Sequence, residues 1–182
     1  MKKWLFLILI PLCIQTNAQF DAVSGGIGFS SGVDFNLATT GNPAIFGKAY
    51  LKINGRLHLV PGVTVFMKGE EGSSFSDDIR KNYMFHGDLD AHYGIFKEDP
   101  ITFLGFAGLN VTGIVSKVVG NIDLQDQTTF KPGLNVGAAM QMRINDRYSA
   151  YLSGKYILSE FDQFVINLGV TYFFSSQRRR GW

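Results

Sequence analysis

Apolar and polar residues alternate with a period of two in eight separate stretches of this chain. Such alternation is typical of β-strands, because successive side chains of a strand point to opposite faces. In the clearest stretch, Leu89, Ala91 and Tyr93 alternate with Asp88 and Asp90. The pattern predicts eight strands, at 21–31, 45–53, 56–67, 82–96, 101–115, 133–144, 148–158 and 164–174.

The connections between these strands alternate in length. Those at 54–55, 97–100 and 145–147 are short, and Asn54-Gly55 is a strong signal for a tight hairpin turn. The intervening connections are mostly longer and polar, at 32–44, 68–81 and 116–132, with a shorter one at 159–163. Membrane-spanning β-barrels have this arrangement, with tight turns on one side of the bilayer and longer loops on the other.

Aromatic residues gather at both ends of the apolar faces. A soluble barrel also alternates, with its apolar face inward, but its core has no reason to sort aromatic residues into two belts. Such belts are typical of surfaces that meet lipid at two interfaces. We therefore expect an all-β, closed, eight-stranded antiparallel up-and-down transmembrane barrel, since backbone groups in lipid must pair internally. The loop-end belt contains Phe29, Tyr83, Phe85, Tyr156 and Phe164, and the turn-end belt contains Tyr93, Phe103, Tyr148, Tyr172 and Phe174.

The last predicted strand carries a polar residue, a glycine and two aromatics, Asn167, Gly169, Tyr172 and Phe174. This spacing resembles the terminal signal that outer-membrane barrels present to their assembly machinery. Over residues 19–174 the chain resembles the small eight-stranded outer-membrane β-barrel family of Gram-negative bacteria, the OmpX/OmpA-type barrels and their porin-like relatives. The resemblance implies an integral outer-membrane protein that contacts membrane lipid, lipopolysaccharide and the barrel-assembly machinery. A short basic tail, 175–182, follows the strand.

The first 18 residues have the pattern of a signal peptide. Lys2 and Lys3 precede an apolar run at 4–14, and Ala18 is a small residue before the expected cleavage site. The run is too short to cross a bilayer of roughly 30 Å as a helix. We expect cleavage before Gln19; a lipoprotein anchored on Cys13 and a short anchor helix are the alternatives.

Cleavage at this position changes the charge of the chain. It removes the only cysteine and two of the 17 basic residues, leaving 15 basic and 15 acidic residues. The mature chain then forms no disulfide, and no net field attracts nucleic acid. A chain that is 46% hydrophobic and only 18% charged is also unlike a disordered one.

The polar faces of the eight strands predict the contents of the barrel. Eight strands enclose only enough room for side chains, and unpaired buried charges are costly. We therefore expect a plug of ion pairs and hydrogen bonds, with a narrow water-filled path as the alternative. The expected polar network comprises Lys48, Lys52, His58, His86, Asp88, Asp90, His92, Asn110, Gln141, Arg143, Lys155 and Asn167.

His86, Asp88, Asp90 and His92 share one face of a single strand. Two histidines and two carboxylates can hold a divalent metal or supply an acid and a base. However, residues i and i+2 lie almost 7 Å apart along a strand, and no nucleophile stands out nearby. We expect neither a metal site nor a catalytic site. Glycines 25, 26 and 28 lie within a strand, which excludes a dinucleotide fingerprint, and no cofactor is expected.

An even number of strands places both chain ends on one side, and export delivers them to the periplasm. The tight turns then face the periplasm and the longer loops face outward. The sequence favours a structural or surface-interaction barrel that presents its external loops. A narrow channel for small solutes and an outer-membrane enzyme acting on lipid are the alternatives.

Overall fold

The computed structural model describes residues 19–31, 42–67, 69–72, 79–119, 127–160 and 162–175. The expected signal peptide, 1–18, lies outside the described residues. So do most of the basic tail and much of the 32–44, 68–81 and 116–132 connections. Cleavage before Gln19 therefore stays a prediction. Within the described part of the chain, no helix has the length and apolar character needed to cross a membrane.

Nine strands run through the described residues, and eight of them form the barrel. The ninth, β4, is a short strand at one end. The strands are β1 (Gln19–Ser31), β2 (Asn42–Lys52), β3 (Leu57–Phe66), β4 (Gly69–Gly72), β5 (Ile79–Glu98), β6 (Ile101–Val119), β7 (Gln127–Arg143), β8 (Tyr148–Ser159) and β9 (Gln163–Phe173).

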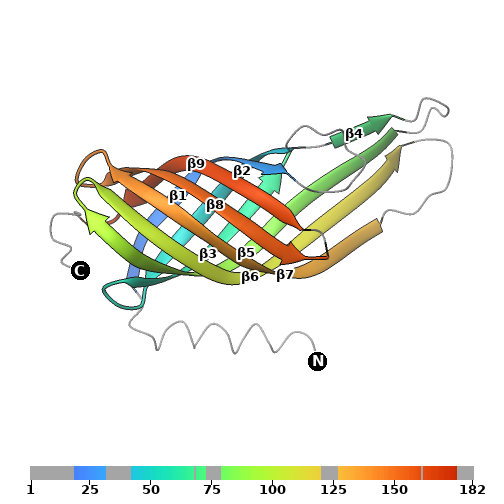
Figure 1. The fold of residues 1–182 in the computed structure, drawn as a ribbon. Helices are drawn as coiled ribbons and strands as arrows, with labels where there is room; N and C mark the ends of the chain where they lie inside the picture. Colours follow the sequence, from blue (N-terminus) through green and yellow to red (C-terminus); the bar gives the residue numbers. More distant parts are fainter. Residues whose placement is uncertain are drawn as a thin grey trace.

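Each barrel strand pairs with its neighbour in sequence, and the first pairs with the last. β3 pairs with β5, so that β4 is left outside the ring. β1 and β9 close it in an antiparallel register that runs from Ala22 opposite Phe173 to Ser31 opposite Phe164. Figure 1 shows the resulting barrel of tilted strands. The prediction of a closed, eight-stranded antiparallel up-and-down barrel is confirmed.

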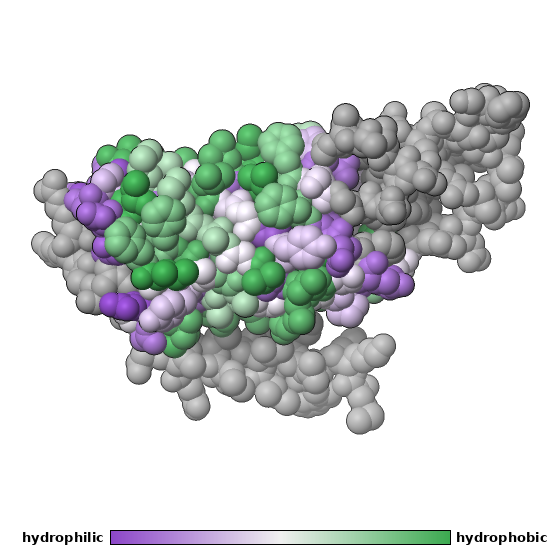
Figure 2. Space-filling model, viewed as in Figure 1, coloured by the Kyte–Doolittle hydropathy of each residue, from purple (hydrophilic) through white to green (hydrophobic). Residues whose placement is uncertain are grey.

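The outward face of the barrel is apolar. Large hydrophobic side chains are exposed on every barrel strand, among them Ile27 on β1, Leu109 on β6 and Leu152 on β8. Between the two ends of the barrel, the described surface in Figure 2 is mostly hydrophobic, with hydrophilic residues toward the ends. Apolar side chains outside and polar ones inside invert the arrangement of a soluble barrel and match that of a membrane barrel.

The central strands are longer than the alternation predicted. β5, β6 and β7 have 20, 19 and 17 residues, whereas β2, β3 and β9 have 11, 10 and 11. The prediction that 68–81 is wholly a loop was wrong, because Gly69–Gly72 pairs with Ile79–Asn82 of β5. The sequence Gly69-Glu70-Glu71-Gly72 has no apolar–polar alternation, so the period of two could not predict this strand.

Glycines allow the first and last strands to approach closely. Gly26 of β1 lies opposite Gly169 of β9. A Cβ atom built on Gly169 would lie 2.2 Å from the carbonyl oxygen of Gly25, and one on Gly26 would lie 2.2 Å from that of Leu168. Any side chain at either position would push the two strands apart, so the closure depends on this pair.

Candidate functional site

A network of charged and amide side chains fills the middle of the lumen. Lys155 Nζ donates to Asp88 Oδ2 at 2.7 Å, and both side chains are almost completely buried. Asn110 and Asn135 donate to Asp88 Oδ1 at 2.7 and 2.8 Å. Asn135 also donates to Asp90 Oδ1 at 2.8 Å. The network joins β5, β6, β7 and β8, and it gives the Asp88 carboxylate the compensation that burial requires.

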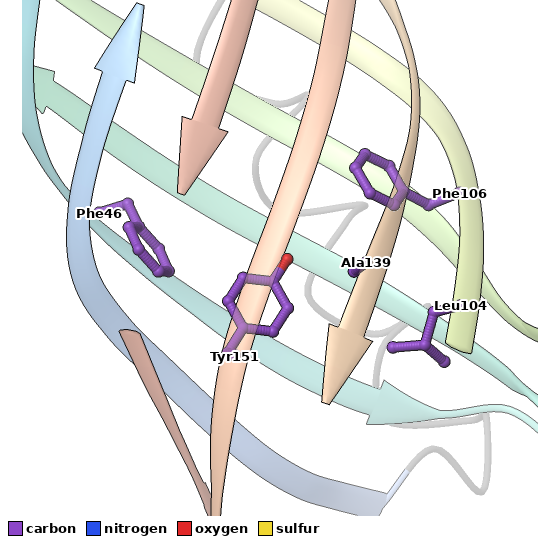
Figure 3. Packing of buried hydrophobic residues seen from close by; sticks show 5 residues of the cluster. All are labelled: Phe46, Leu104, Phe106, Ala139 and Tyr151. Carbon is purple, nitrogen blue, oxygen red and sulfur yellow. The ribbon is translucent and has the colours of Figure 1, made fainter. Parts of the chain in front are cut away.

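Apolar and aromatic side chains share the lumen with these polar groups. Phe46, Leu104, Phe106, Ala139 and Tyr151 form one buried cluster, which Figure 3 shows projecting from several strands. Lys48 Nζ lies 5.3 Å from the ring centre of Phe106 and 5.7 Å from that of Tyr151, within the range of a cation–π contact. It also donates to Tyr151 Oη at 3.4 Å. The buried ammonium is thereby held by π faces and one hydroxyl.

Two histidines of β5 are packed against aromatic rings. His92 stacks on Phe106, with ring centres 4.5 Å apart and planes within 7°, and meets Tyr50 edge-on at 5.7 Å. His86 meets Phe66 at 4.7 Å. His92 Nε2 lies 4.0 Å from Asp90 Oδ2, which is too long for a hydrogen bond. Both imidazoles therefore pack against aromatic rings.

The four residues from His86 to His92 do not converge on one point. Asp88 is bound by Lys155 and two asparagines, while His92 packs on aromatic rings. Within the described ranges, no group of three or more His, Cys, Asp or Glu residues is placed to hold a metal ion. Their shared strand face spreads them along the barrel axis instead, as the spacing along a strand requires.

The structure places the expected polar residues at two depths. Lys48, His86, Asp88, Asp90, His92, Asn110, Lys155 and Asn167 are buried, whereas Lys52, His58, Gln141 and Arg143 are half-buried near the tight turns. Asn167, toward the opposite side of the network, donates to Ser153 Oγ at 3.4 Å.

An open cavity of about 80 Å³ lies at the turn end of the barrel. His58 Nε2 there contacts Asp21 Oδ2 at 3.1 Å, and Arg143 Nη2 donates to Asp99. Lys52 also lines the cavity. The half-buried members of the expected network therefore form a separate group at the mouth of the barrel, apart from the buried network around Asp88.

The residues of the terminal strand lie on both faces of β9. Asn167 is buried in the lumen, and Gly169 forms the close contact with β1. The Tyr172 ring lies 5.1 Å from Tyr148 and 5.6 Å from Phe174, in the aromatic belt at the turn end. Each residue of this pattern therefore has a local packing role in the barrel. The use of the pattern as an assembly signal stays a prediction.

The sequence reasoning missed the apolar half of the lumen. The missed residues are on the inward face, where their positions in the alternation place them. The period of two shows which residues share a face of a strand, but it does not show which of those residues fill the interior. Large apolar residues at inward positions could have indicated this part of the lumen. They are Phe46, Val60, Phe66, Leu104, Phe106, Tyr151, Ile157, Val165 and Phe173.

At the loop end, the sheet continues beyond the barrel. Ser116–Val119 of β6 pairs with Ile79–Asn82 of β5, which in turn pairs with β4. On the other side, residues 127–132 of β7 pair with β6 but not with β8, whose pairing begins at Gly133. Figure 1 shows β4–β7 reaching past the other strands at this end. Among the described residues, no strand pairs with the outer edge of β7 at 127–130.

No protein-family model matches this sequence, and no curated protein matches it either. Solved structures do match. Neisserial surface protein A (NspA) superposes with a TM-score of 0.65 at 15% identity, covering 87% of this chain and 99% of that one. The N-terminal β-barrel domain of Pseudomonas aeruginosa OprF gives 0.60 at 15% identity, covering 87% and 100%.

A third match is Ail, the attachment invasion locus protein of Yersinia pestis, in complex with the heparin analogue sucrose octasulfate. It has a TM-score of 0.59 at 15% identity and covers 86% of this chain and 100% of that one. At this level of identity the matches establish the fold. The chain has the fold of the small eight-stranded outer-membrane β-barrels, as the resemblance implied.

Proposed function

We propose that this chain is an integral outer-membrane protein of a Gram-negative bacterium with a structural or surface-interaction role. The observation that carries the proposal is the combination of a lipid-compatible outer face with a filled lumen. Exposed apolar residues surround the barrel, while Asp88, Lys155 and Tyr151 are buried inside it. Such a barrel is stable in a bilayer and leaves only its two ends to meet soluble partners.

The surface-interaction role is supported by the shape of the loop end. β5, β6 and β7 continue beyond the barrel with β4, and among the described residues no strand pairs with the outer edge of β7 at 127–130. An unpaired edge offers backbone N–H and C=O groups to another extended segment. Thr128, Thr129 and Phe130 on this edge are exposed. We propose that this extension is the part of the molecule that meets external partners.

The proposal includes no catalysis. Asp88, the carboxylate most central to the lumen, is neutralised by Lys155 and bound by two amides. A general base needs access to a substrate proton, and neither Asp88 nor His92 is exposed. The lipid-modifying alternative predicts loss of a lipid product in His86→Ala and His92→Ala. Our proposal predicts that the lipid composition of these variants is unchanged.

The apolar outer face suggests lipid as a partner, and the terminal strand suggests the barrel-assembly machinery. We propose that the outer face contacts outer-membrane lipid and lipopolysaccharide. The barrel-assembly machinery would recognise the last strand through Asn167, Gly169, Tyr172 and Phe174. Tyr172 and Phe174 lie on the outward face at the strand end, where another protein can reach them.

Accessibility of inserted epitopes on intact cells tests the location and the orientation together. An epitope at Ser73, between β4 and β5 and outside the described residues, should be labelled on intact cells. A matched epitope at Asp99, in the tight turn between β5 and β6, should be labelled only after the outer membrane is opened. Heat-dependent mobility on SDS gels controls for folding of both variants. Labelling of Asp99 on intact cells would contradict the orientation, and absence from the outer-membrane fraction would contradict the location.

A further inference from the structure

The cavity at the turn end has a lining that is richer in cations than in anions. Its walls include Lys52, Lys97 and Arg143 on the positive side, against Asp21 and Asp99. The cavity volume of about 80 Å³ exceeds the cavity volume of roughly 10–15 Å³ that one water molecule needs. The cavity can therefore hold a small ligand and not only a single bound water.

The two carboxylates of the lining are already paired. Asp21 contacts His58 at 3.1 Å, and Asp99 accepts from Arg143. Lys52 is half-buried, and its side chain forms no ion pair or hydrogen bond with the described residues. Since a guanidinium carries five N–H donors, Arg143 keeps donors beyond the one that Asp99 uses. Positive charge is thus left over at the mouth of the barrel.

A fully buried polar ring also contributes to this lining. His92 has no exposed surface, and neither of its ring nitrogens has a hydrogen-bond partner among the described residues. Buried polar groups in native proteins are nearly always paired, and an exception requires an explanation. One face of the ring is occupied by Phe106. Since no surface of the ring is exposed, we assign it no hydrogen bond to a ligand; the ring lies beside the cavity, where its NMR signals can respond to a bound charge.

We propose that this cavity binds a small phosphate-bearing anion, held by the charges of Lys52 and Arg143, with the buried His92 ring beside it. Several anionic oxygens on one atom match a site with two cations, and arginine binds phosphate in a planar, two-pronged manner. The proposed function places the tight turns in the periplasm, and the inference that the ligand enters from the periplasm rests on that proposal. Binding itself does not depend on that orientation, so it is tested in detergent solution.

The three histidines of the chain provide an internal control. His58 and His92 line the cavity, whereas His86 does not. In purified protein in octyl glucoside, inorganic phosphate should shift the imidazole ¹H–¹⁵N signals of His58 and His92 in a saturable way. The His86 signals should stay in place, and sodium chloride of equal ionic strength should have no such effect. Shifts in all three histidines would show a non-specific effect, and shifts in none, with either inorganic phosphate or the short-chain phosphatidylglycerol described below, would show that the cavity holds only water. Either result would overturn the proposal.

Charge-removing variants test which residues bind. Lys52→Gln and Arg143→Gln should each weaken phosphate binding by about fivefold or more, because each removes a cation from the site. The matched control is Lys131→Gln, which removes the same charge from the opposite end, where Lys131 pairs with Glu160. Equal weakening in all three variants would show a non-specific charge effect and would refute the site.

A second titration identifies the source of the phosphate. Short-chain phosphatidylglycerol carries the group on a lipid headgroup, whereas inorganic phosphate is free. A response of His58 and His92 to inorganic phosphate supports a soluble ligand, and a response to the lipid alone supports a headgroup. Epitope labelling that placed the turns outside the cell would refute the proposed orientation, whereas the phosphate titration would still test the proposed binding.

Discussion

Leu152 lies on the outward face of β8, between Met140 of β7 and Leu168 of β9. It is 41% exposed, and both of its cross-strand neighbours are apolar. In water this arrangement would be unfavourable, whereas in a bilayer it is what a lipid-facing position requires. The exposure of Leu152 therefore indicates whether lipid or water surrounds the barrel.

Replacing this leucine with a charge should be costly in a bilayer. We expect Leu152→Arg to lower the free energy of unfolding in lipid vesicles by roughly 2–4 kcal/mol, because a charge near the midplane loses its hydration. Leu158→Arg, at the end of the same strand, should cost about 1 kcal/mol or less. Urea titration monitored by the β-sheet band in circular dichroism measures both. Equal stability of Leu152→Arg and the wild type would show that this face does not meet lipid.

Lys155 is the cation that compensates Asp88 in the lumen. We expect Lys155→Met to cost about 3–5 kcal/mol of stability, because it leaves a buried carboxylate with only amide donors. Adding Asp88→Asn should recover a large part of that loss, and the double-mutant cycle measures the coupling.

The matched control for this cycle is the rim pair of Lys131 and Glu160, where Glu160 is largely exposed. Lys131→Met should cost about 1 kcal/mol or less, because water screens an exposed pair. A Lys155→Met variant as stable as Lys131→Met would mean that the Asp88 carboxylate is hydrated in the lumen.

At the scale of the elements, the seam between β1 and β9 is where the barrel closes. Gly169 is part of the terminal pattern recognised in the sequence, and the structure gives it a packing reason as well. A Cβ atom at this position would lie 2.2 Å from a backbone oxygen of β1. The glycine is therefore required by strand closure, whatever the assembly machinery reads.

We expect Gly169→Ala to destabilise the folded barrel by about 1–3 kcal/mol, the usual range for overpacking. Gly47→Ala is the matched control, because a Cβ there meets no atom within 4 Å. It should leave the stability unchanged or raise it by up to about 1 kcal/mol, since alanine restricts the unfolded chain. The heat-modifiable fraction on SDS gels and urea titration give the two stabilities. Similar results for both variants would show that β1 and β9 separate easily.

The whole molecule is a tube whose interior is filled. Phe46, Phe106 and Tyr151 pack beside Lys48, and the network around Asp88 crosses the same lumen. Eight strands leave room for little else. The packing therefore disfavours the alternative of a narrow channel for small solutes.

Planar bilayer recordings test this conclusion. We expect the wild-type protein to show no stable ion conductance, because side chains occupy the path between the two ends. Tyr151→Ala removes the largest fully buried side chain, so it should be the variant that most readily passes current. The outward substitution Leu158→Ala, which leaves the lumen intact, is the control. Steady conductance of the wild type would mean that the lumen contains a continuous water path.

The alternation of apolar and polar residues by itself determined the number of strands in the barrel, the face on which each side chain lies and the alternation of turns with loops. These features are local, because the period of two is a property of the extended backbone. Leu89 and Asp90 thus point to opposite sides whatever their partners are. Aromatic belts and apolar outer faces then indicated lipid rather than water as the surroundings.

Only the tertiary structure decided which inward residues meet. Asp88 and Lys155 are 67 positions apart, and their contact depends on the tilt and register of four strands. The cavity beside His92 likewise depends on which side chains fill the turn end. The pairing of Gly69–Gly72 with Ile79–Asn82 also became visible only in the structure, because Gly69-Glu70-Glu71-Gly72 has no apolar–polar alternation. Local geometry sets the direction of each side chain, whereas contacts across a barrel follow from how the whole sheet closes.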